Sequence, residues 1–457
     1  MKQRVHHIHL VGIGGVGMAG LAEILRASGY RVSGSDRRES AVLERLRPLG
    51  IVAHVGHAAE HIEGADVVVY STAIPATNPE LMAAERAQVP VIPRAEMLAE
   101  LMRTRRGIAV AGSHGKTTTT SMIGALLQAA ELDPTIVVGG RVHSLGSNAH
   151  LGSSDLMVAE ADESDGSFLR LWPTIVVVTN IDREHLDYYK SLERLRDAFL
   201  DFVNRVPFWG ACVLCLDDPQ VQDLLPRLTR RARTYGLTPQ AEIRAEDIEA
   251  HGLTMRFRVR VGEKELGQVQ LGVPGRHNVQ NALAAIAVAL ELDVPFEAMR
   301  SAFAVFRGVE RRFERRGERG GVEVIEDYAH HPTEIRATLA AARQAYTGRI
   351  VVAFQPHRYT RTRDLFEDFA RAFHDADVLL ITEIYAAGEE KSPGIDAAAL
   401  AEAARDCGHR HVSFVGELPD LIPALESLTR AGDVLFFMGA GDIGRQAAAF
   451  LEGGRSD

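Results

Sequence analysis

Cysteine and tryptophan are scarce in this chain of 457 residues, which has 3 cysteines and 2 tryptophans. So few cysteines exclude a disulfide framework and fit a reducing compartment. Cys212 and Cys215 form a CxxC, but they lie in an apolar run that is typical of a strand, where residues three apart point to opposite faces. Since only Cys407 remains to complete a zinc site, we expect buried structural cysteines rather than a metal centre.

Long apolar runs are also missing. No stretch reaches the roughly 18 uninterrupted apolar residues of a membrane span, and the first residues run into a glycine-rich turn rather than a signal-peptide cleavage site. The sequence therefore predicts a cytoplasmic protein with no membrane partner. The net charge of −10 argues against a nucleic-acid partner, because neutralisation of phosphates dominates such binding.

Strand-like apolar runs alternate with helical patterns almost throughout the chain, which predicts an α/β fold with parallel sheets. Short alternating runs between residues 231 and 273 predict a few added antiparallel strands. The alternation of strands and helices restarts near residue 105 and again near residue 309, which predicts domain boundaries at both places. We thus expect a Rossmann-like domain at 1–104, a central domain with a phosphate loop at 105–308, and a second Rossmann-like domain at 309–457.

A glycine fingerprint, GIGGVG, follows the strand-like IHLV and precedes a helical pattern, with Gly12, Gly14 and Gly17 in the required positions. The next strand-like run ends at Asp36. This pattern is typical of a dinucleotide-binding turn, which holds a pyrophosphate at the amino end of a helix. A dehydrogenase would need two mononucleotide halves, whereas fewer than about 100 residues precede the next domain. A single pyrophosphate-bearing ligand such as a nucleotide sugar fits better, and a structural turn without a ligand is the alternative.

A second glycine fingerprint, GAGDIG at residues 439–444, follows the strand-like DVLFFM. No further strand and no acidic residue at the right distance follow it in the sequence. We therefore interpret this stretch as a tight turn after a strand rather than as a nucleotide site.

The stretch GSHGKTTTT at residues 112–120 has the Gly-Lys-Thr end of a phosphate loop, although Val110 stands where the full pattern has a glycine. It lies between a strand-like run and a helical pattern, which is the context that such a loop needs. The amino end of the helix and Lys116 can face the β- and γ-phosphates of ATP, and the Thr117 hydroxyl can bind magnesium. The alternative is an ordinary helix start with several threonines.

Acidic residues and a histidine follow two further strand-like runs. Glu160 ends one apolar run, at the sheet edge where open parallel sheets place their ligand-binding residues, and we favour it as a metal ligand. For its neighbours Asp162, Glu163 and Asp165, the alternative interpretation is that they only form a solvated turn. His185 follows the next run at the same edge. A role as a metal ligand and a role as a structural histidine are equally compatible with this position.

Seven motifs occur in order along the chain: GSHGKTTTT, AEADESDGSF, TNIDREHLD, PGRHNVQNALAA, RRFE, DYAHHPTE and QPHRYTRTRDL. In this order and at these separations they resemble the Mur ligases of bacterial cell-wall synthesis, over nearly the whole chain. GIGGVGMAGLAEIL together with AEADESDGSF is most similar to the alanine-adding branch, in which the shortened phosphate loop is normal. Many relatives carry a carbamylated lysine where this chain has Phe199 and Leu200, and its absence agrees with the same branch.

The family joins an amino acid to a carboxylate in two steps: ATP phosphorylates the carboxylate, and the amine then attacks the acyl phosphate. The resemblance therefore implies three small-molecule substrates, which are UDP-N-acetylmuramate, L-alanine and ATP. It also implies two Mg²⁺ ions, because phosphoryl transfer to a carboxylate brings like charges together. We expect a monomer or a weak homodimer.

The resemblance further implies which residues form the sites for catalysis, metal and ATP. From the sequence alone, Asn278 could equally cap a helix, and the basic run around Arg312 would be an exposed charged face. Expected in catalysis are Lys116, Glu160, His185, His330 and Arg358, and as metal ligands Thr117, Glu160 and His185. Expected at ATP are Gly112, Ser113, His114, Gly115, Lys116, Thr117, Thr118, Asn278, Asn281, Arg312 and Asp327.

Two more groups of residues are implied for the other substrates. Arginine side chains can hold the carboxylate of the amino acid by paired hydrogen bonds, while aromatic residues shape a small pocket. Expected at the UDP-sugar are Gly12, Gly14, Gly15, Gly17, Ser35, Asp36, Ser71 and Thr72. Expected at the amino acid are Tyr328, His330, His357, Arg358 and Arg361.

Two rival interpretations are left open by the sequence. A recycling relative attaches a preformed tripeptide to the same UDP-sugar, although AEADESDGSF and the first glycine turn differ from that branch. A protein that binds the UDP-sugar and ATP without turnover is the other rival, and it would not require intact Lys116, Glu160 and His185.

Overall fold

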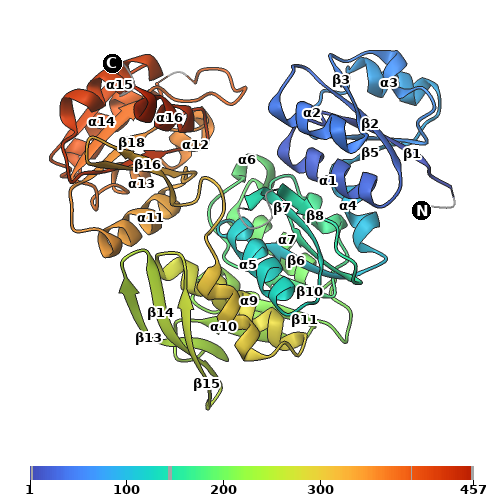
Figure 1. Ribbon diagram of the computed structural model, residues 1–457, viewed down its shortest axis with the longest axis horizontal. Coiled ribbons are helices and arrows are strands. Elements are labelled where there is room, and N and C mark those ends of the chain that lie inside the picture. The colour runs from blue at the N-terminus through green and yellow to red at the C-terminus, as the bar shows by residue number, and fades with distance from the viewer. Residues whose placement is uncertain (2–3, 143–146, 393, 454–457) are drawn as a thin grey trace. The chain divides into compact units, whose positions relative to one another are not determined.

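The computed structural model describes residues 1, 4–142, 147–392 and 394–453, which build three sheets flanked by helices (Figure 1). The α/β prediction with three sheet domains is therefore confirmed. Contacts divide the chain into two compact units, of which the first holds the first sheet and most of the central sheet, and the second holds the third sheet and the adjoining ends of β13 and β14. The first unit comprises Met1–Asp247, Phe257–Gln270 and Gln280–Arg307, and the second comprises Ile248–Arg256, Leu271–Val279 and Gly308–Asp457.

The first sheet has five strands in the order β3-β2-β1-β4-β5, and all its neighbours pair in parallel. Its middle strand β1 is buried along its whole length, as expected for a parallel sheet covered on both faces. Its elements are β1 (His7–Val11), α1 (Val16–Ala27), β2 (Arg31–Asp36), α2 (Ala41–Leu46), η1 (Arg47–Leu49), β3 (Val52–Val55), η2 (Ala59–Ile62), β4 (Val67–Tyr70), α3 (Pro79–Arg86), β5 (Val91–Pro93) and α4 (Arg94–Met102).

The central sheet has ten strands in the order β15-β14-β13-β12-β11-β10-β6-β9-β7-β8. Strand β6 lies between β10 and β9 and is parallel to both, so the carboxyl ends of all three strands meet at one edge. The elements are β6 (Arg106–Ala111), α5 (Lys116–Ala129), β7 (Thr135–Val142), β8 (Ser147–His150), β9 (Leu156–Glu160), η3 (Ser167–Arg170), β10 (Ile175–Val178), α6 (Leu186–Tyr189), α7 (Leu192–Val203), β11 (Ala211–Cys215), α8 (Pro219–Gln222), η4 (Leu225–Arg227), β12 (Ala232–Gly236), β13 (Ile243–His251), β14 (Thr254–Val261), β15 (Lys264–Leu271), α9 (Arg276–Glu291) and α10 (Phe296–Val305).

The strands added between residues 231 and 273 follow the prediction only in part. β12 pairs in parallel with both β11 and β13, so the first of the added strands continues the parallel sheet. The next neighbours in the sheet, β13, β14 and β15, are joined by turns at residues 252–253 and 262–263. Turns of two residues join antiparallel strands, so the antiparallel expectation holds from β13 onward.

The third sheet has six strands in the order β16-β17-β21-β18-β19-β20. Only β16 and β17 pair antiparallel, and the other neighbours are parallel. Its elements are β16 (Glu314–Arg319), β17 (Val322–Asp327), α11 (Pro332–Ala345), β18 (Ile350–Phe354), α12 (Tyr359–Asp364), α13 (Phe366–Ala370), β19 (Val378–Thr382), α14 (Ala397–Asp406), β20 (Val412–Gly416), α15 (Leu418–Leu428), β21 (Val434–Met438) and α16 (Gly444–Glu452).

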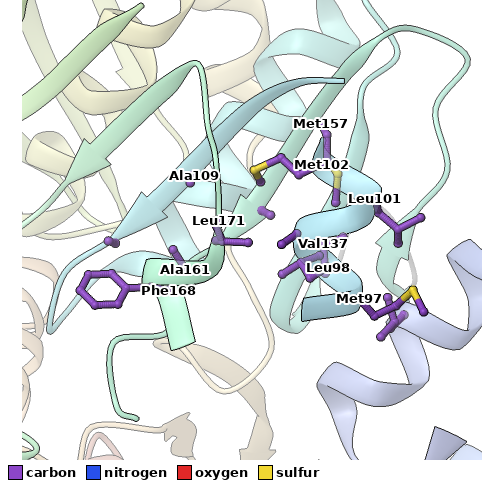
Figure 2. Packing of buried hydrophobic residues seen from close by; sticks show 14 of the residues in the cluster. Met97, Leu98, Leu101, Met102, Ala109, Val137, Met157, Ala161, Phe168 and Leu171 are labelled. Carbon is purple, nitrogen blue, oxygen red and sulfur yellow. The ribbon is translucent and has the colours of Figure 1, made fainter. Parts of the chain in front are cut away.

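One buried cluster runs from the first sheet into the central sheet through helix α4. Figure 2 shows apolar side chains of α4, among them Leu98 and Met102, in the same cluster as Val137 of β7 and Met157 of β9. Met102 also packs on Gly107 of β6, where an added Cβ would meet its Cγ at 2.4 Å. Helix α4 therefore fixes the start of β6, which is the strand that leads into the phosphate loop.

Two smaller predictions are also confirmed. Cys212 and Cys215 are buried in β11, and burial raises the pKa of each thiol to about 12, so neither is a reactive thiolate. The stretch GAGDIG forms a turn between β21 and α16. Its first residue, Gly439, has a φ of 147°, and an added Cβ there would lie 2.8 Å from the carbonyl oxygen of Gln355.

The expected domain boundaries fall between elements: 104/105 lies between α4 and β6, and 308/309 lies between α10 and β16. As limits of independently folding domains they stay predictions. Among the described residues, no helix has the length and apolar character needed to cross a membrane.

Candidate active site

The phosphate loop connects the carboxyl end of β6 to the amino end of α5. Gly112 has a φ of 134°, and an added Cβ would lie 2.1 Å from the Thr179 hydroxyl oxygen. Gly115 has a φ of 81°, and an added Cβ would lie 2.7 Å from Asn281 Oδ1. Both positions therefore require glycine, and the loop closes without the glycine that Val110 replaces.

Lys116 and Thr117 begin α5 and turn toward two different carboxylates. Lys116 Nζ donates to Glu163 Oε1 at 2.8 Å and to the carbonyl oxygen of Gly112 at 2.5 Å. The Thr117 hydroxyl lies 3.1 Å from Glu160 Oε2, which also accepts the Gly139 N–H at 2.7 Å. The structure thus joins the lysine, the threonine and Glu160 in one site, as the sequence indicated.

Glu163 does not lie in a solvated turn, which was the alternative for the residues after Glu160. Its side chain is 0% exposed and forms an ion pair with Lys116. Burial raises the pKa of Glu163, and the ammonium of Lys116 opposes that shift. Burial lowers the pKa of Lys116, but the carboxylates of Glu163, Asp162 and Glu160 outweigh it and raise the pKa overall. We conclude that this is a buried pair whose lysine stays charged.

His185 lies in the connection between β10 and α6, close to the ion pair of Lys116 and Glu163. It has a φ of 56°, and its Nε2 lies 3.7 Å from Glu163 Oε1 and 3.8 Å from Glu184 Oε2. Ligand atoms of Glu163, Glu184 and His185 all lie within 4.8 Å of one another. Lys190, which follows α6, donates to the carbonyl oxygen of Asp187.

The segment after β10 fixes the loop from the side. Asn180 Oδ1 accepts the His114 N–H at 2.8 Å, and its Nδ2 donates to the His114 carbonyl at 3.0 Å. The Ser113 hydroxyl accepts the Asp182 N–H at 2.8 Å, and His114 Nε2 lies 2.9 Å from Asp182 Oδ2. Ser113 and His114 therefore hold the shape of the loop through side chain and main chain.

The remaining residues expected at ATP lie in both units. Thr118 is half-buried in the first turn of α5, and Asn281 Oδ1 accepts from the Thr119 hydroxyl at 3.1 Å beside the phosphate loop. Asn278 belongs to the second unit, where its Nδ2 donates to the Pro274 carbonyl at 2.7 Å.

The first glycine turn is held mainly by main-chain bonds. The N–H of Gly12 donates to the Ser35 carbonyl at 2.8 Å, and the N–H of Gly14 donates to Asp36 Oδ2 at 2.9 Å. The segment that begins at Ser71 covers Gly12, since an added Cβ there would lie 3.4 Å from Ser71 Cβ. Gly15, whose backbone caps α1, is exposed. The turn, Asp36 and the Ser71 segment are thus brought together, and Thr72 lies exposed beside Ser71.

Ser35 faces the interior rather than the turn. Its hydroxyl donates to Glu80 Oε2 at 2.5 Å, and both side chains are fully buried. Glu80 also lies within hydrogen-bond distance of His61 Nδ1, at 2.7 Å, and of His57 Nδ1, at 3.2 Å. Burial raises the pKa of Glu80, but the His9 imidazole 3.8 Å away and the hydrogen bonds with Ser35 and His61 outweigh it and lower the pKa to about 2.

In the second unit, two arginines lie over the ring of Tyr328, with Arg311 at 4.9 Å and Arg312 at 5.1 Å from its centroid. Arg311 is fixed by Glu326, at 2.6 Å, whereas Arg312 Nη1 lies 3.4 Å from Glu334. Asp327 is buried and accepts the N–H of Phe313 and of Ala329 at 2.8 and 2.7 Å. Burial raises the pKa of Asp327 to about 6, with Arg312 opposing.

The residues expected at the amino acid form one group in this unit. The rings of Tyr328 and His330 are 5.2 Å apart, and those of His330 and His357 are 5.9 Å apart. Arg361 Nη1 lies 3.2 Å from His357 Nδ1. Arg358 has a φ of 69° and is the N-cap residue of α12. Burial, and then the neighbouring His330, Arg361 and Arg358, lower the pKa of His357 to about 3, so its imidazole is neutral at pH 7.

Three family models match most of this chain: the Mur ligase family, catalytic domain at residues 7–106; the Mur ligase middle domain at residues 110–289; and the Mur ligase, glutamate ligase domain at residues 311–441. The chain belongs to the Mur ligase family. A relative from Sorangium cellulosum, named UDP-N-acetylmuramate–L-alanine ligase, is 58% identical over 445 residues, covering 97% of this chain and 95% of the relative.

Solved structures of Mur ligases agree with the fold. UDP-N-acetylmuramate-alanine ligase MurC from Thermotoga maritima superposes with a TM-score of 0.84 at 32% identity, covering 98% of this chain and 99% of that one. A murein peptide ligase from Psychrobacter arcticus gives 0.72 at 24% identity, with 98% of each chain covered, and supports the fold alone.

Sequence reasoning missed two side chains of this Mur ligase. Glu163 was not singled out from its acidic neighbours, because no local pattern distinguishes the one carboxylate that turns inward. Arg94 begins α4, and its Nη1 lies 3.1 Å from where a Cβ would stand on Gly17 of the first glycine turn. A positive residue at the end of a strand in this domain is the signal that would have found it.

Proposed function

We propose that this protein is an ATP-dependent ligase that joins L-alanine to the lactyl carboxylate of UDP-N-acetylmuramate. ATP phosphorylates the carboxylate, and the amine of alanine displaces phosphate from the acyl phosphate, which leaves ADP and phosphate. The names of the full-length relatives support the choice of substrates. The product is a precursor of peptidoglycan.

The observation that carries this proposal is the arrangement of Lys116 and Thr117 at the amino end of α5, each beside a carboxylate. The main-chain N–H groups of the loop and the helix dipole attract the β- and γ-phosphates. Lys116 adds a positive charge where negative charge accumulates during phosphoryl transfer. An ordinary helix start would need neither the buried ion pair nor the two conformationally restricted glycines.

The donors in this site fit Mg²⁺. Thr117 and Glu160 offer a hydroxyl and a carboxylate for one ion, and His185 offers an imidazole nitrogen for another. Glu163 Oε2 is buried without a hydrogen-bond partner in the described part of the chain, which is an observation that favours a cation nearby. Bound there, Mg²⁺ would neutralise phosphate charge. Of the residues expected in catalysis, Lys116, Glu160 and His185 act at this site.

The first glycine turn would bind the diphosphate of the UDP-sugar through main-chain N–H groups at the start of α1. Asp36 is already bonded to the Gly14 N–H, so we assign it to the shape of the turn as well as to the ligand. Ser35 would act through its main chain, because its hydroxyl is bonded to Glu80. Ser71 and Thr72 would close over the ligand from β4.

The second unit would bind L-alanine. Arg358 and Arg361 offer guanidinium groups for its carboxylate. His357 is neutral at pH 7 and so can accept a hydrogen bond from the ammonium group, next to His330 and Tyr328. For Arg312 and Asp327, which belong to the same unit, a role in ATP binding stays a prediction.

The location, the oligomeric state and the partners complete the proposal. We assign the protein to the cytoplasm as a monomer or a weak homodimer, with small molecules as its ligands and neither nucleic acid nor membrane as a partner. The net charge of −10 supports the assignment against nucleic acid.

The test is release of phosphate from ATP in the presence of UDP-N-acetylmuramate and one acceptor at a time. Turnover with L-alanine, and not with D-glutamate or the tripeptide L-alanyl-D-glutamyl-diaminopimelate, is the expected result. Turnover with the tripeptide would indicate that the protein catalyses the recycling reaction instead. No turnover with any acceptor would leave a protein that binds UDP-sugar and ATP without catalysis.

A further inference from the structure

Glu163 is a buried carboxylate with only one of its two oxygens satisfied. Its side chain is 0% exposed, and Oε1 accepts from Lys116 Nζ at 2.8 Å. Oε2 has no hydrogen-bond partner in the described part of the chain. An unsatisfied buried carboxylate oxygen costs free energy, so its retention beside the phosphate loop suggests that a ligand completes it.

Helix α6 holds Glu163 and His185 together. The Tyr189 hydroxyl, at the end of α6, donates to the main-chain carbonyl of Glu163 at 2.6 Å. His185, at the start of α6, has a φ of 56°, a conformation that costs free energy for a residue other than glycine. The helix thus fixes the backbone of Glu163 at one end and directs an imidazole toward its carboxylate at the other.

Three donor groups converge at this point. His185 Nε2 lies 3.7 Å from Glu163 Oε1 and 3.8 Å from Glu184 Oε2, and both carboxylates are buried. Ligand atoms of the three residues lie within 4.8 Å of one another. Two carboxylate oxygens and one imidazole nitrogen form a donor set that suits Mg²⁺ or Mn²⁺.

Binding of ATP changes the charge balance of this cluster. Lys116 is the ammonium that neutralises Glu163 in the absence of nucleotide, and the proposed function requires the same ammonium at the phosphates. If Lys116 turns to the phosphates, Glu163 is left buried without a positive partner, which is strongly destabilising. A divalent cation that contacts Glu163 removes that cost and also neutralises the phosphate charge.

We propose that Glu163 and Glu184, together with His185, bind the second divalent cation of this ligase. This inference rests on the proposed function for the presence of ATP, though not for the identity of the acceptor. Glu160 is instead hydrogen-bonded to the Thr117 hydroxyl, and the proposed function assigns that pair to the other cation.

The competing explanation is that Glu163 only positions Lys116. Both explanations predict lower activity when Glu163 is replaced, so activity does not distinguish them. The number of metal ions bound does, because a carboxylate that only positions the lysine leaves the metal stoichiometry unchanged.

The experiment uses Mn²⁺ as the probe, with the electron paramagnetic resonance signal of free Mn²⁺ as the readout. The full-length protein is titrated in the presence of a non-hydrolysable ATP analogue and UDP-N-acetylmuramate. We expect two tight Mn²⁺ ions per chain in the wild type and one in Glu163→Gln, with the second ion weakened by about 10-fold or more. Glu163→Asp should recover part of the affinity for the second ion, since it restores the charge.

The matched control is Asp165→Asn, on the same acidic segment, where Asp165 Oδ1 accepts the Ser167 N–H at 3.0 Å. It should bind two ions like the wild type. Circular dichroism and the affinity for the ATP analogue establish that each variant is folded. If Glu163→Gln does not fold, Glu184→Gln tests the same site and should also lose the second ion.

Retention of two ions at wild-type affinity in Glu163→Gln would overturn the proposal and leave Glu163 as a positioning residue for Lys116. This outcome is distinct from failure of the proposed function. If phosphate release never responds to L-alanine while Glu163→Gln loses the second ion, the function fails and the metal assignment stands.

Discussion

The phosphate loop and the first glycine turn both present main-chain N–H groups at the amino end of a helix, yet they distribute charge differently. In the phosphate loop, Lys116 is paired with buried Glu163 inside the site itself. In the glycine turn, the buried carboxylate of Glu80 is instead bonded to serine and histidine side chains in the interior. The proposed binding of ATP therefore requires Lys116 to exchange its ionic partner, whereas the proposed binding of the UDP-sugar leaves the buried network of Glu80 unchanged.

The largest effect is expected from Lys116→Ala. It removes the charge that faces the phosphates and also leaves Glu163 buried without its partner, so phosphate release should fall by about 10³-fold or more. The measurement is single-turnover phosphate release. Lys190→Ala is the control, because Lys190 is exposed and bonds only a main-chain carbonyl among the contacts described. If phosphate release falls no further in Lys116→Ala than in this control, the ion pair of Lys116 and Glu163 has no role in phosphoryl transfer.

The next effect concerns stability rather than turnover. The pKa of Glu80 is lowered from 4.5 to about 2, which corresponds to about 3 kcal/mol of stabilisation of the first sheet. Because the folded pKa is depressed, this stabilisation is present above pH 4.5 and is lost as the pH falls toward 2. Glu80→Gln should therefore speed hydrogen exchange in β1 and β2 at pH 7.

The control for that change is Glu85→Gln, on the exposed face of the same helix α3. The difference in exchange between Glu80→Gln and the wild type should shrink at lower pH, after correction for the intrinsic pH dependence. Equal protection of the two variants at pH 7 would show that the buried network does not stabilise the sheet.

A smaller effect is expected from Gly14→Ala. The added Cβ would lie 2.7 Å from Asp36 Oδ2 and disturb the bond that shapes the turn. Affinity for UDP-N-acetylmuramate should fall by about 30-fold, equivalent to about 2 kcal/mol, while affinity for ATP is unchanged. Isothermal titration with each ligand measures both. Gly15→Ala should cost less, since its Cβ would lie at 3.4 Å from the Gly12 carbonyl oxygen.

The smallest effect should follow Arg94→Ala. If the glycine turn binds a diphosphate mainly through main-chain N–H groups, loss of this one side chain should weaken UDP-sugar binding by only about 5- to 10-fold, and less at high salt. Arg103→Ala, an exposed arginine paired with Glu100, is the control. A loss of UDP-sugar affinity in Arg94→Ala as large as the loss of phosphate release expected in Lys116→Ala would mean that both sites depend on a single charge.

How much the sequence revealed differs between these regions for a physical reason. A phosphate loop and a glycine turn are local patterns, and the order of strands brings their carboxyl ends to one edge, so Lys116, Thr117 and Glu160 could be placed together from the sequence. Glu163 and Glu80 owe their roles to burial against residues far along the chain, which no local pattern records. The parallel pairing of β12 with β13 was missed for the same reason, since pairing depends on the path of the connection.

Phe199 has a consequence for the chemistry of the cell. A carbamylated lysine forms only when dissolved carbon dioxide adds to a neutral amine, so ligases that depend on it respond to carbon dioxide as well as to their substrates. Here Phe199 is fully buried against Phe168, with ring centroids 5.3 Å apart, and offers no amine. At this position the chain therefore offers no group that carbon dioxide could modify.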